Sequence, residues 1–264
     1  MPELPDVAGF QSYLESTALH QKIARVSISD DRIVHDVSSR TLRRRLKRRR
    51  FQMVSRHGKY LFVHLDDDAG WLVLHFGMTG ELDYGKTEGE APAFTRAAFE
   101  FDHEYRLAYI SRRMLGRITL ADDRARFIEE QELGPDALAD DLDGKRFRAL
   151  LGNRRGPAKH VLMDQSLIAG IGNVYADEIL FRLRWHPRIR IADLGDDEIG
   201  ALFRAMRRVL RTAAERGGDP ARLPRSFMLP HRDGDGRCPE CGTALETMTI
   251  SGRTSYFCPR CQTS

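Results

Sequence analysis

Residues 238–261 read CPECGTALETMTISGRTSYFCPRC, and the spacing of the cysteines predicts how the end of the chain folds. The four cysteines are the only ones among 264 residues and follow the pattern C-x2-C-x16-C-x2-C. Each C-x-x-C pair places two thiolates on one side of a tight turn, and four thiolates complete a closed tetrahedral site. We therefore expect one structural Zn2+ held by Cys238, Cys241, Cys258 and Cys261. Disulfides, redox-active pairs and an iron–sulfur cluster are the alternatives.

The residues between the two cysteine pairs are predicted to form a β-hairpin. Residues 246–250 and 254–257 have strand character, and Ser251-Gly252-Arg253 supplies the turn. Such a hairpin would hold Arg253 rigidly at its tip, where a guanidinium can grip two phosphate oxygens. A solvated turn arginine is the alternative for this residue.

The rest of the chain is expected to contain a β-rich half followed by a helical half. A helix is predicted over residues 5–18, and an antiparallel β-sandwich or barrel from short strands at 60–65, 71–76, 98–101, 107–110 and 117–120. Further helices are predicted at 127–131, 144–151, 159–168, 174–183 and 196–216. The predicted class is α+β with three domains, at residues 1–121, 122–225 and 226–264.

The composition is that of a globular protein and is compatible with nucleic-acid binding. Hydrophobic residues make up 41% and charged residues 30%, which argues against a disordered chain. No apolar run approaches the roughly 18 residues of a membrane span, and the N-terminus does not read as a secretory signal. The net charge of +4 is dominated by arginine, which suits phosphate. An arginine-biased genome is the plain alternative.

The segment AGIGNVYADE, residues 169–178, contains two glycines but fails as a dinucleotide fingerprint. Tyr175 stands where the third glycine would be, and a helix is predicted before the segment where a strand is required. We interpret it as a turn between two helices, with Asn173 as the N-cap of the second. The N–H groups of that helix start could bind phosphate, although a helix hairpin without a ligand is the simpler interpretation.

Residues 40–59 hold ten Arg or Lys and no Asp or Glu. Such a run is usually a solvated surface. Here it leads through His57-Gly58 into a predicted strand, which places Lys59 at the strand edge. The run by itself is weak support for a function, and Lys59 matters only in combination with other residues.

The N-terminal sequence Met1-Pro2-Glu3 suggests a nucleophile. Removal of Met1 would expose Pro2 as a secondary amine, and an α-amino group is a weaker base than a lysine side chain. Attack of such an amine on an aldehyde-like sugar carbon gives an iminium, which serves as an electron sink for elimination. Glu3 follows directly and could move a proton in that step.

Together these residues resemble the formamidopyrimidine-DNA glycosylase and endonuclease VIII family of DNA repair enzymes. The matching motifs run from residue 2 to residue 262 in the family's order. They are Pro2-Glu3-Leu4-Pro5-Asp6, His57-Gly58-Lys59-Tyr60-Leu61, His75-Phe76-Gly77-Met78-Thr79-Gly80, residues 159–165 with 170–178, and residues 252–262. The resemblance implies an N-terminal β-sandwich with a flanking helix, a helix-two-turns-helix domain and a zinc finger.

The resemblance further implies a bifunctional DNA glycosylase with abasic-site lyase activity in base excision repair. It would excise oxidised bases, with formamidopyrimidine and 8-oxoguanine-type purines favoured and oxidised pyrimidines open, and then cleave the strand by β,δ-elimination. Pro2 would be the nucleophile at C1′, Glu3 the acid–base residue, and Lys59 a contact to phosphates near the lesion that supports the reaction. No redox or nucleotide cofactor is expected beside zinc.

DNA-binding roles follow from the same resemblance. Backbone phosphates would be held by Lys159, Asn173 and Arg253. Met78 and Arg112 would enter the gap left by the extruded base and offset part of the few kcal/mol that flipping costs. The expected partner is double-stranded DNA with a damaged base or an abasic site, bound by a monomer in a bacterial-type, nucleoid-associated cytoplasmic setting, with no membrane.

Three departures from the family pattern bear on substrate choice. Arg112-Arg113 is followed by Met114-Leu115-Gly116, where the family commonly has Phe-Gly, so the sequence does not show which side chain completes the wedge. Ala8 stands at a commonly acidic position, and the segment between Gly218 and Cys238 is shorter than in members that grip 8-oxoguanine. A non-catalytic lesion-binding relative and an unrelated zinc-ribbon protein of RNA metabolism are the competing functions.

Overall fold

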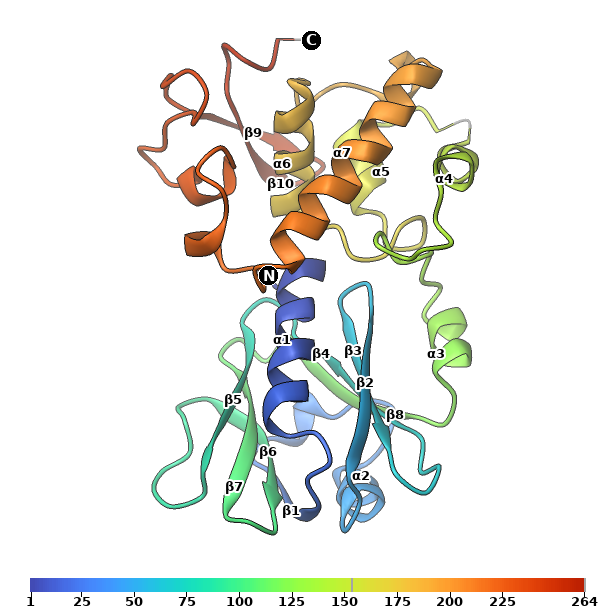
Figure 1. Ribbon diagram of the computed structural model, residues 1–264, viewed down its shortest axis with the longest axis vertical. Helices are drawn as coiled ribbons and strands as arrows, with labels where there is room; N and C mark the ends of the chain where they lie inside the picture. The colour runs from blue at the N-terminus through green and yellow to red at the C-terminus, as the bar shows by residue number, and fades with distance from the viewer. Residues whose placement is uncertain (153, 264) are drawn as a thin grey trace. The chain divides into compact units, whose positions relative to one another are not determined.

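The structure, a computed structural model, describes residues 1–152 and 154–263 (Figure 1). Its contacts separate two units: Met1–Pro2 with Asp6–Gln131, and Glu3–Pro5 with the described residues from Glu132 onward. Helix α3 (Arg124–Glu130) belongs to the first unit because Phe127 packs against Phe62 of the sandwich. The three-domain division expected from the sequence stays a prediction. The two units of the structure do not separate the cysteine segment from the helices.

The first unit is built from two four-stranded antiparallel sheets, which confirms the predicted sandwich. One sheet has the order β1 (Ile23–Ile28), β6 (Thr95–Phe101), β7 (Tyr105–Ser111) and β5 (Gly80–Lys86). The other has the order β2 (Phe51–His57), β3 (Tyr60–Leu65), β4 (Trp71–His75) and β8 (Arg117–Ala121). The sheets share a core, in which Phe51 meets Phe99 edge-on at 5.7 Å between ring centroids.

Strands β1, β2 and β5 were not predicted, and all three lie at sheet edges. An edge strand can expose much of its length, and β5 (GELDYGK) buries only its first residue, so its apolar pattern is weak. The basic run also forms more structure than a solvated surface would. It forms all but the first residue of helix α2 (Ser39–Leu46), in which Leu42 and Leu46 are buried, and it continues into β2.

Helix α1 (Leu4–Thr17) buries Val7 and Leu14 in the core of the first unit, in agreement with the predicted helix at 5–18. Short 3-10 segments complete the chain at Asp31–Ile33, Ile191–Asp193, Pro220–Arg222 and Leu229–His231. Across the described residues, no helix combines the length and the hydropathy that crossing a bilayer requires.

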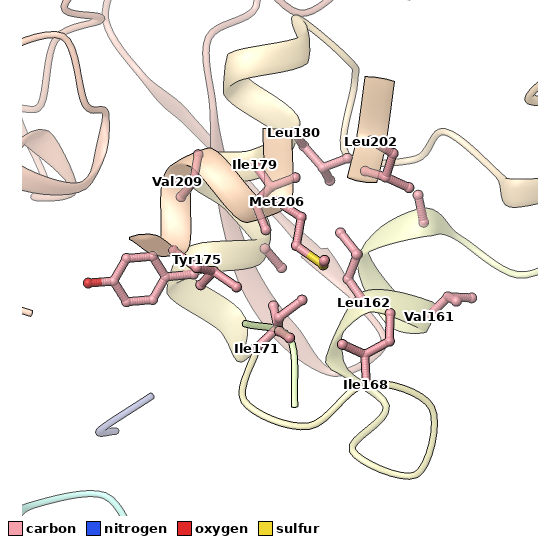
Figure 2. Close-up of a cluster of buried hydrophobic side chains, with 14 of the residues drawn as sticks. Val161, Leu162, Ile168, Ile171, Tyr175, Ile179, Leu180, Leu202, Met206 and Val209 are labelled. Carbon is pink, nitrogen blue, oxygen red and sulfur yellow. The ribbon is translucent and has the colours of Figure 1, made fainter. Parts of the chain in front are cut away.

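The second unit is helical and carries the β-hairpin. Its helices are α4 (Gly144–Leu151), α5 (Ala158–Met163), α6 (Asn173–Leu183) and α7 (Asp196–Ala214). Leu162, Ile179 and Met206 come together from α5, α6 and α7 in its core (Figure 2). Helix α5 ends earlier than predicted because the Asp164 carboxylate accepts a hydrogen bond from the Ser166 backbone N (3.0 Å) and closes a turn. The hairpin strands β9 (Glu246–Ile250) and β10 (Arg253–Phe257) confirm the predicted ones.

Candidate active site and DNA-binding surface

Glu3 is 1% exposed, and its carboxylate caps helix α6. Oε2 accepts hydrogen bonds from the backbone N of Gly172 (2.7 Å) and Tyr175 (3.2 Å), and Oε1 accepts one from Val174 N (2.8 Å). The first N–H groups of a helix have no partner inside it, and the positive end of the helix dipole favours a carboxylate there. The helix start therefore fixes the predicted acid–base residue in one position.

The two glycines of residues 169–178 make room for this clamp. A Cβ at Gly172 would lie 2.4 Å from Glu3 Cδ, and one at Gly170 would lie 2.6 Å from Leu4 Cδ1. Leu4 N also donates a hydrogen bond to Gly170 O (3.0 Å). The segment thus receives the start of the chain, and Gly172, not Asn173, is the N-cap of α6. The N-cap prediction was wrong by one residue because the capping carboxylate comes from position 3.

Pro2 is partly exposed and directly precedes the clamped residues Glu3 and Leu4. Its nitrogen is joined to Met1 in the chain described here, so the expected amine requires removal of that residue. The nucleophilic role of Pro2 stays a prediction.

Lys59 lies in the two-residue turn of the β2–β3 hairpin and is 7% exposed. Gly58 precedes it with φ 56°, the left-handed value that a glycine at the first position of a type II′ turn adopts. His75 on the neighbouring strand pairs with Tyr60. Burial, together with the positive charges of Lys59 and Arg117, lowers the pKa of His75 from 6.5 to about 4. The imidazole near Lys59 is therefore neutral at physiological pH.

The loops that carry Met78 and Arg112 lie side by side. A Cβ at Gly77 would lie 2.3 Å from the Leu115 carbonyl, so only glycine permits this approach, and its φ is 57°. Arg113 N donates a hydrogen bond to Thr79 Oγ1 (3.2 Å) and links the loops a second time. The structure thus brings together the two predicted wedge residues, and Met78 is 41% exposed.

Met114 and Leu115, although adjacent in the chain, lie in different environments. Met114 has φ 55° and packs against the core of the sandwich, whereas Leu115 is 48% exposed. Gly116 then fits tightly, since a Cβ there would lie 1.9 Å from Tyr109 Oη, which donates to His75 O (2.7 Å). The extra residue is accommodated by turning Met114 inward, and this leaves Leu115 as the exposed apolar side chain beside the Met78 loop.

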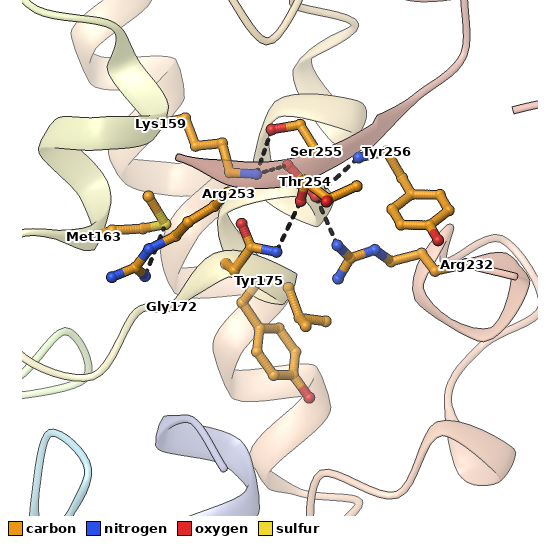
Figure 3. A network of polar contacts seen from close by, with 12 residues as sticks. Lys159, Met163, Gly172, Tyr175, Arg232, Arg253, Thr254, Ser255 and Tyr256 are labelled. Carbon is orange, nitrogen blue, oxygen red and sulfur yellow. Dashed lines mark hydrogen bonds and ion pairs between the residues drawn. The ribbon is translucent and has the colours of Figure 1, made fainter. Parts of the chain in front are cut away.

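Lys159 lies elsewhere than its predicted role suggests. Its side chain is fully buried, with Nζ 2.6 Å from Asp177 Oδ1 and 2.5 Å from Ser255 Oγ (Figure 3). Burial lowers the pKa of the Lys159 ammonium, and the adjacent Asp177 carboxylate opposes that shift. A phosphate has no access to Nζ in this arrangement, so the burial argues against the phosphate contact expected of Lys159.

Asn173 and Arg253 are brought together by strand β10. Asn173 Nδ2 donates a hydrogen bond to Thr254 O (2.9 Å), the residue after Arg253. Arg253 is exposed, and its guanidinium contacts Met163 Sδ (3.6 Å) at the end of α5. Ser251 and Gly252, with φ 48° and 73°, form the two-residue turn between the strands. Arg253 therefore begins β10 directly after the tip and lies next to the α6 start.

The four cysteines fit a tetrahedral zinc site. Their Sγ atoms all lie within 4.8 Å of one another, with Cys238–Cys261 at 3.8 Å and Cys241–Cys258 at 3.5 Å. Zn–S bonds of about 2.3 Å in a tetrahedron place sulfurs about 3.8 Å apart. The donor set is closed and partly buried against Phe181 and Met228, which confirms the prediction of one structural Zn2+.

Comparison with known proteins places this arrangement in a family. Residues 1–118 match the model "Formamidopyrimidine-DNA glycosylase N-terminal domain", residues 133–224 match the "H2TH domain" of the same enzyme, and residues 236–263 match "Zinc finger found in FPG and IleRS". The fold and site are thus those of a DNA glycosylase of the helix-two-turns-helix type.

Relatives extend the match over the whole chain. Formamidopyrimidine-DNA glycosylase of Moorella thermoacetica is 37% identical over 99% of this chain and 92% of its own length. The enzyme of Thermomicrobium roseum is 36% identical over 83% and 84%. Lactococcus lactis Fpg bound to N7-benzyl-Fapy-dG DNA has a TM-score of 0.89 at 28% identity and full coverage of both chains. Its complex with DNA containing an abasic site has the same TM-score at 27% identity over 99% and 100%. The chain belongs to the formamidopyrimidine-DNA glycosylase family.

Proposed function

We propose that this protein excises oxidised bases from double-stranded DNA and then cleaves the strand at the abasic site, as a bifunctional glycosylase and lyase of base excision repair. The observation that carries the proposal is the clamp on the start of the chain. Three backbone N–H groups, one of the N-cap Gly172 and two of the first turn of α6, hold Glu3, the residue after Pro2. The alternative, an unrelated zinc-ribbon protein of RNA metabolism, would account for the cysteine segment alone and would leave the clamp on Glu3 unexplained.

The chemistry follows from a free Pro2 nitrogen. The amine bonds to C1′ of the damaged nucleotide while the glycosidic bond breaks, and the base leaves with the bonding electrons and takes up a proton. Opening of the sugar ring, assisted by proton transfer through Glu3, gives an iminium. Loss of a C2′ proton expels the 3′ phosphate, and a second elimination expels the 5′ phosphate. The zinc has four cysteine ligands, so its part is to fold the hairpin.

DNA contacts are proposed for residues of both units, each considered within its own unit. The exposed Arg253 and the half-buried Asn173 would bind backbone phosphate. Lys59, which is 7% exposed in its hairpin turn, would contact phosphates near the lesion. Met78 and Arg112 would fill the space of the extruded base. Leu115 is proposed as the third member of this wedge, because it is the exposed apolar side chain on the loop that touches the Met78 loop.

The proposed substrates are formamidopyrimidine and 8-oxoguanine-type purines, with oxidised pyrimidines open. The names of the relatives support the purines, and the short segment before Cys238 keeps the pyrimidines open. A monomer that works on the nucleoid in the cytoplasm suits a repair enzyme whose substrate is chromosomal DNA.

Borohydride trapping tests the proposal directly. Labelled duplexes with 8-oxoguanine, a formamidopyrimidine, thymine glycol or an abasic site are incubated with protein whose intact mass shows that Met1 is absent. A covalent band establishes the iminium, and its dependence on the lesion separates purine from pyrimidine specificity. The matched control retains an uncleaved N-terminal extension, which blocks the Pro2 nitrogen without altering the folded part. Tight lesion binding with no band from processed protein would favour the non-catalytic lesion-binding relative.

A further inference from the structure

Three successive residues of strand β10 are held by side chains of α5 and α6. Asn173 Nδ2 donates to Thr254 O (2.9 Å), Lys159 Nζ bonds Ser255 Oγ (2.5 Å), and Tyr256 N donates to Asp177 Oδ2 (3.1 Å). Ser255 is fully buried, whereas most of β9 is exposed. The hairpin is therefore fixed to the helices along one strand, beginning at the residue that follows Arg253 (Figure 3).

A buried charge network lies under this strand. Asp177 is 1% exposed and pairs with Lys159 on one oxygen and with Arg232 (2.8 Å) on the other. The Arg232 guanidinium also stacks over the Tyr256 ring, 4.9 Å from its centroid. Asn173 and Asp177 are four residues apart on α6 and so face the strand together. A buried charge is costly unless it is paired, so Lys159, Asp177 and Arg232 hold one another in place.

Lys159 is thus at the centre of an anchor and away from the surface that phosphate could reach. We propose that Lys159 is a positioning residue for DNA binding: through Asp177 and Ser255 it fixes β10 on the helices and so sets the place from which Arg253 meets a phosphate. This inference rests on the proposed function, because it assumes that Arg253 contacts DNA.

A double-mutant cycle separates positioning from direct contact. Lys159→Met keeps the chain length and leaves Asp177 paired with Arg232, so the fold should survive. Binding is measured by fluorescence anisotropy, over a range of salt concentrations, on a duplex with a tetrahydrofuran abasic-site analogue. Lys145→Met removes one exposed lysine of α4 and controls for net charge. Lys159→Met should weaken binding about tenfold alone and less than about twofold in an Arg253→Ala background, because substitutions that act through one backbone segment are not additive.

The salt dependence gives the second readout. Each lost phosphate contact lowers the slope of log K against log salt by about 1. We expect Lys159→Met to leave the slope unchanged in the Arg253→Ala background. Effects that multiply, with a further drop of about 1 in the slope, would overturn the proposal and restore Lys159 as a direct phosphate contact.

Limited proteolysis tests the anchor without DNA. Loosening β10 should speed trypsin cleavage after Arg253 in Lys159→Met and, to a smaller degree, in Ser255→Ala, but not in Lys145→Met. Ser255→Ala removes a single hydroxyl and serves if Lys159→Met fails to fold. Unchanged cleavage would refute the anchor. If the wild-type protein neither binds lesion DNA nor forms a covalent band with it, the result counts against the proposed function. The trypsin cleavage rates would still show whether Lys159 anchors β10.

Discussion

Replacing Gly172 with alanine should dislodge Glu3 while leaving α6 helical. The backbone at Gly172 has φ −128°, which alanine adopts without strain, so the effect is steric. The new Cβ would lie 2.4 Å from Glu3 Cδ, whereas ordinary contacts begin at 3.4 Å. The carboxylate must therefore retreat by about 1 Å, which stretches hydrogen bonds of 2.7–3.2 Å beyond their useful range.

The magnitude follows from the bonds that are lost. A hydrogen bond to a charged group contributes about 1.5–3 kcal/mol, so losing two of the three costs about 3–6 kcal/mol. At about 2–4 °C per kcal/mol, the melting temperature of the second unit should fall by at least about 6 °C. Displacing the proposed acid–base residue should also slow base excision by about 10²-fold or more in single-turnover assays on a lesion duplex.

Gly195→Ala is the matched control. Gly195 is also a helix N-cap whose backbone N donates to a glutamate, Glu198 (2.7 Å), but a Cβ there would meet that carboxylate at an ordinary 3.7 Å. Both substitutions share the cost of alanine at an N-cap. Equal melting temperatures and excision rates for the two variants would refute the steric clamp.

Three further outcomes are expected. Leu115→Ala should slow excision of a lesion base from a duplex several-fold more than cleavage of a preformed abasic site, because only the first needs a base turned out of the stack; equal slowing would remove Leu115 from the wedge. Burial raises the pKa of Glu178 to about 7 from 4.5, so the folded state binds this proton more tightly than the unfolded state. Its contribution to stability is therefore largest below pH 4.5 and is lost as the pH rises to 7, by about 3 kcal/mol. In urea denaturation, the free energy of unfolding of Glu178→Gln should rise relative to that of the wild type as the pH increases over that range. A constant difference between the two proteins would contradict the burial argument. Cys258→Ser should lose zinc by metal analysis and DNA affinity by anisotropy together, since so small a finger folds around its metal; full affinity without zinc would make the finger dispensable.

Sequence patterns predicted the elements that are determined by residues close to one another in the chain. The cysteine spacing predicted the zinc site and both hairpin strands almost to the residue, and β3 over residues 60–65 matched its bounds. Strands β1, β2 and β5 were not predicted because they bury few of their side chains. The same limit applies to helix α2, whose two buried leucines are hidden among arginines.

Site residues with distant partners could not be placed from the sequence. Glu3 caps a helix 169 residues away, so a rule that looks for the N-cap beside the helix selected Asn173. Lys159 was expected at the surface because its burial depends on Ser255, 96 residues further along the chain. The inward turn of Met114 likewise depends on how Gly77 and Gly116 pack, which no local pattern reports.

The capping of α6 by Glu3 also sets an order of events during synthesis. The backbone groups that hold Glu3 follow it in the chain by 169 to 172 residues and are therefore made later. At about 5–20 residues per second, the ribosome needs about 10 to 30 seconds to make that distance. Glu3 and its neighbours are thus accessible to other proteins well before α6 exists, and Glu3 reaches its final position only after α6 has been translated.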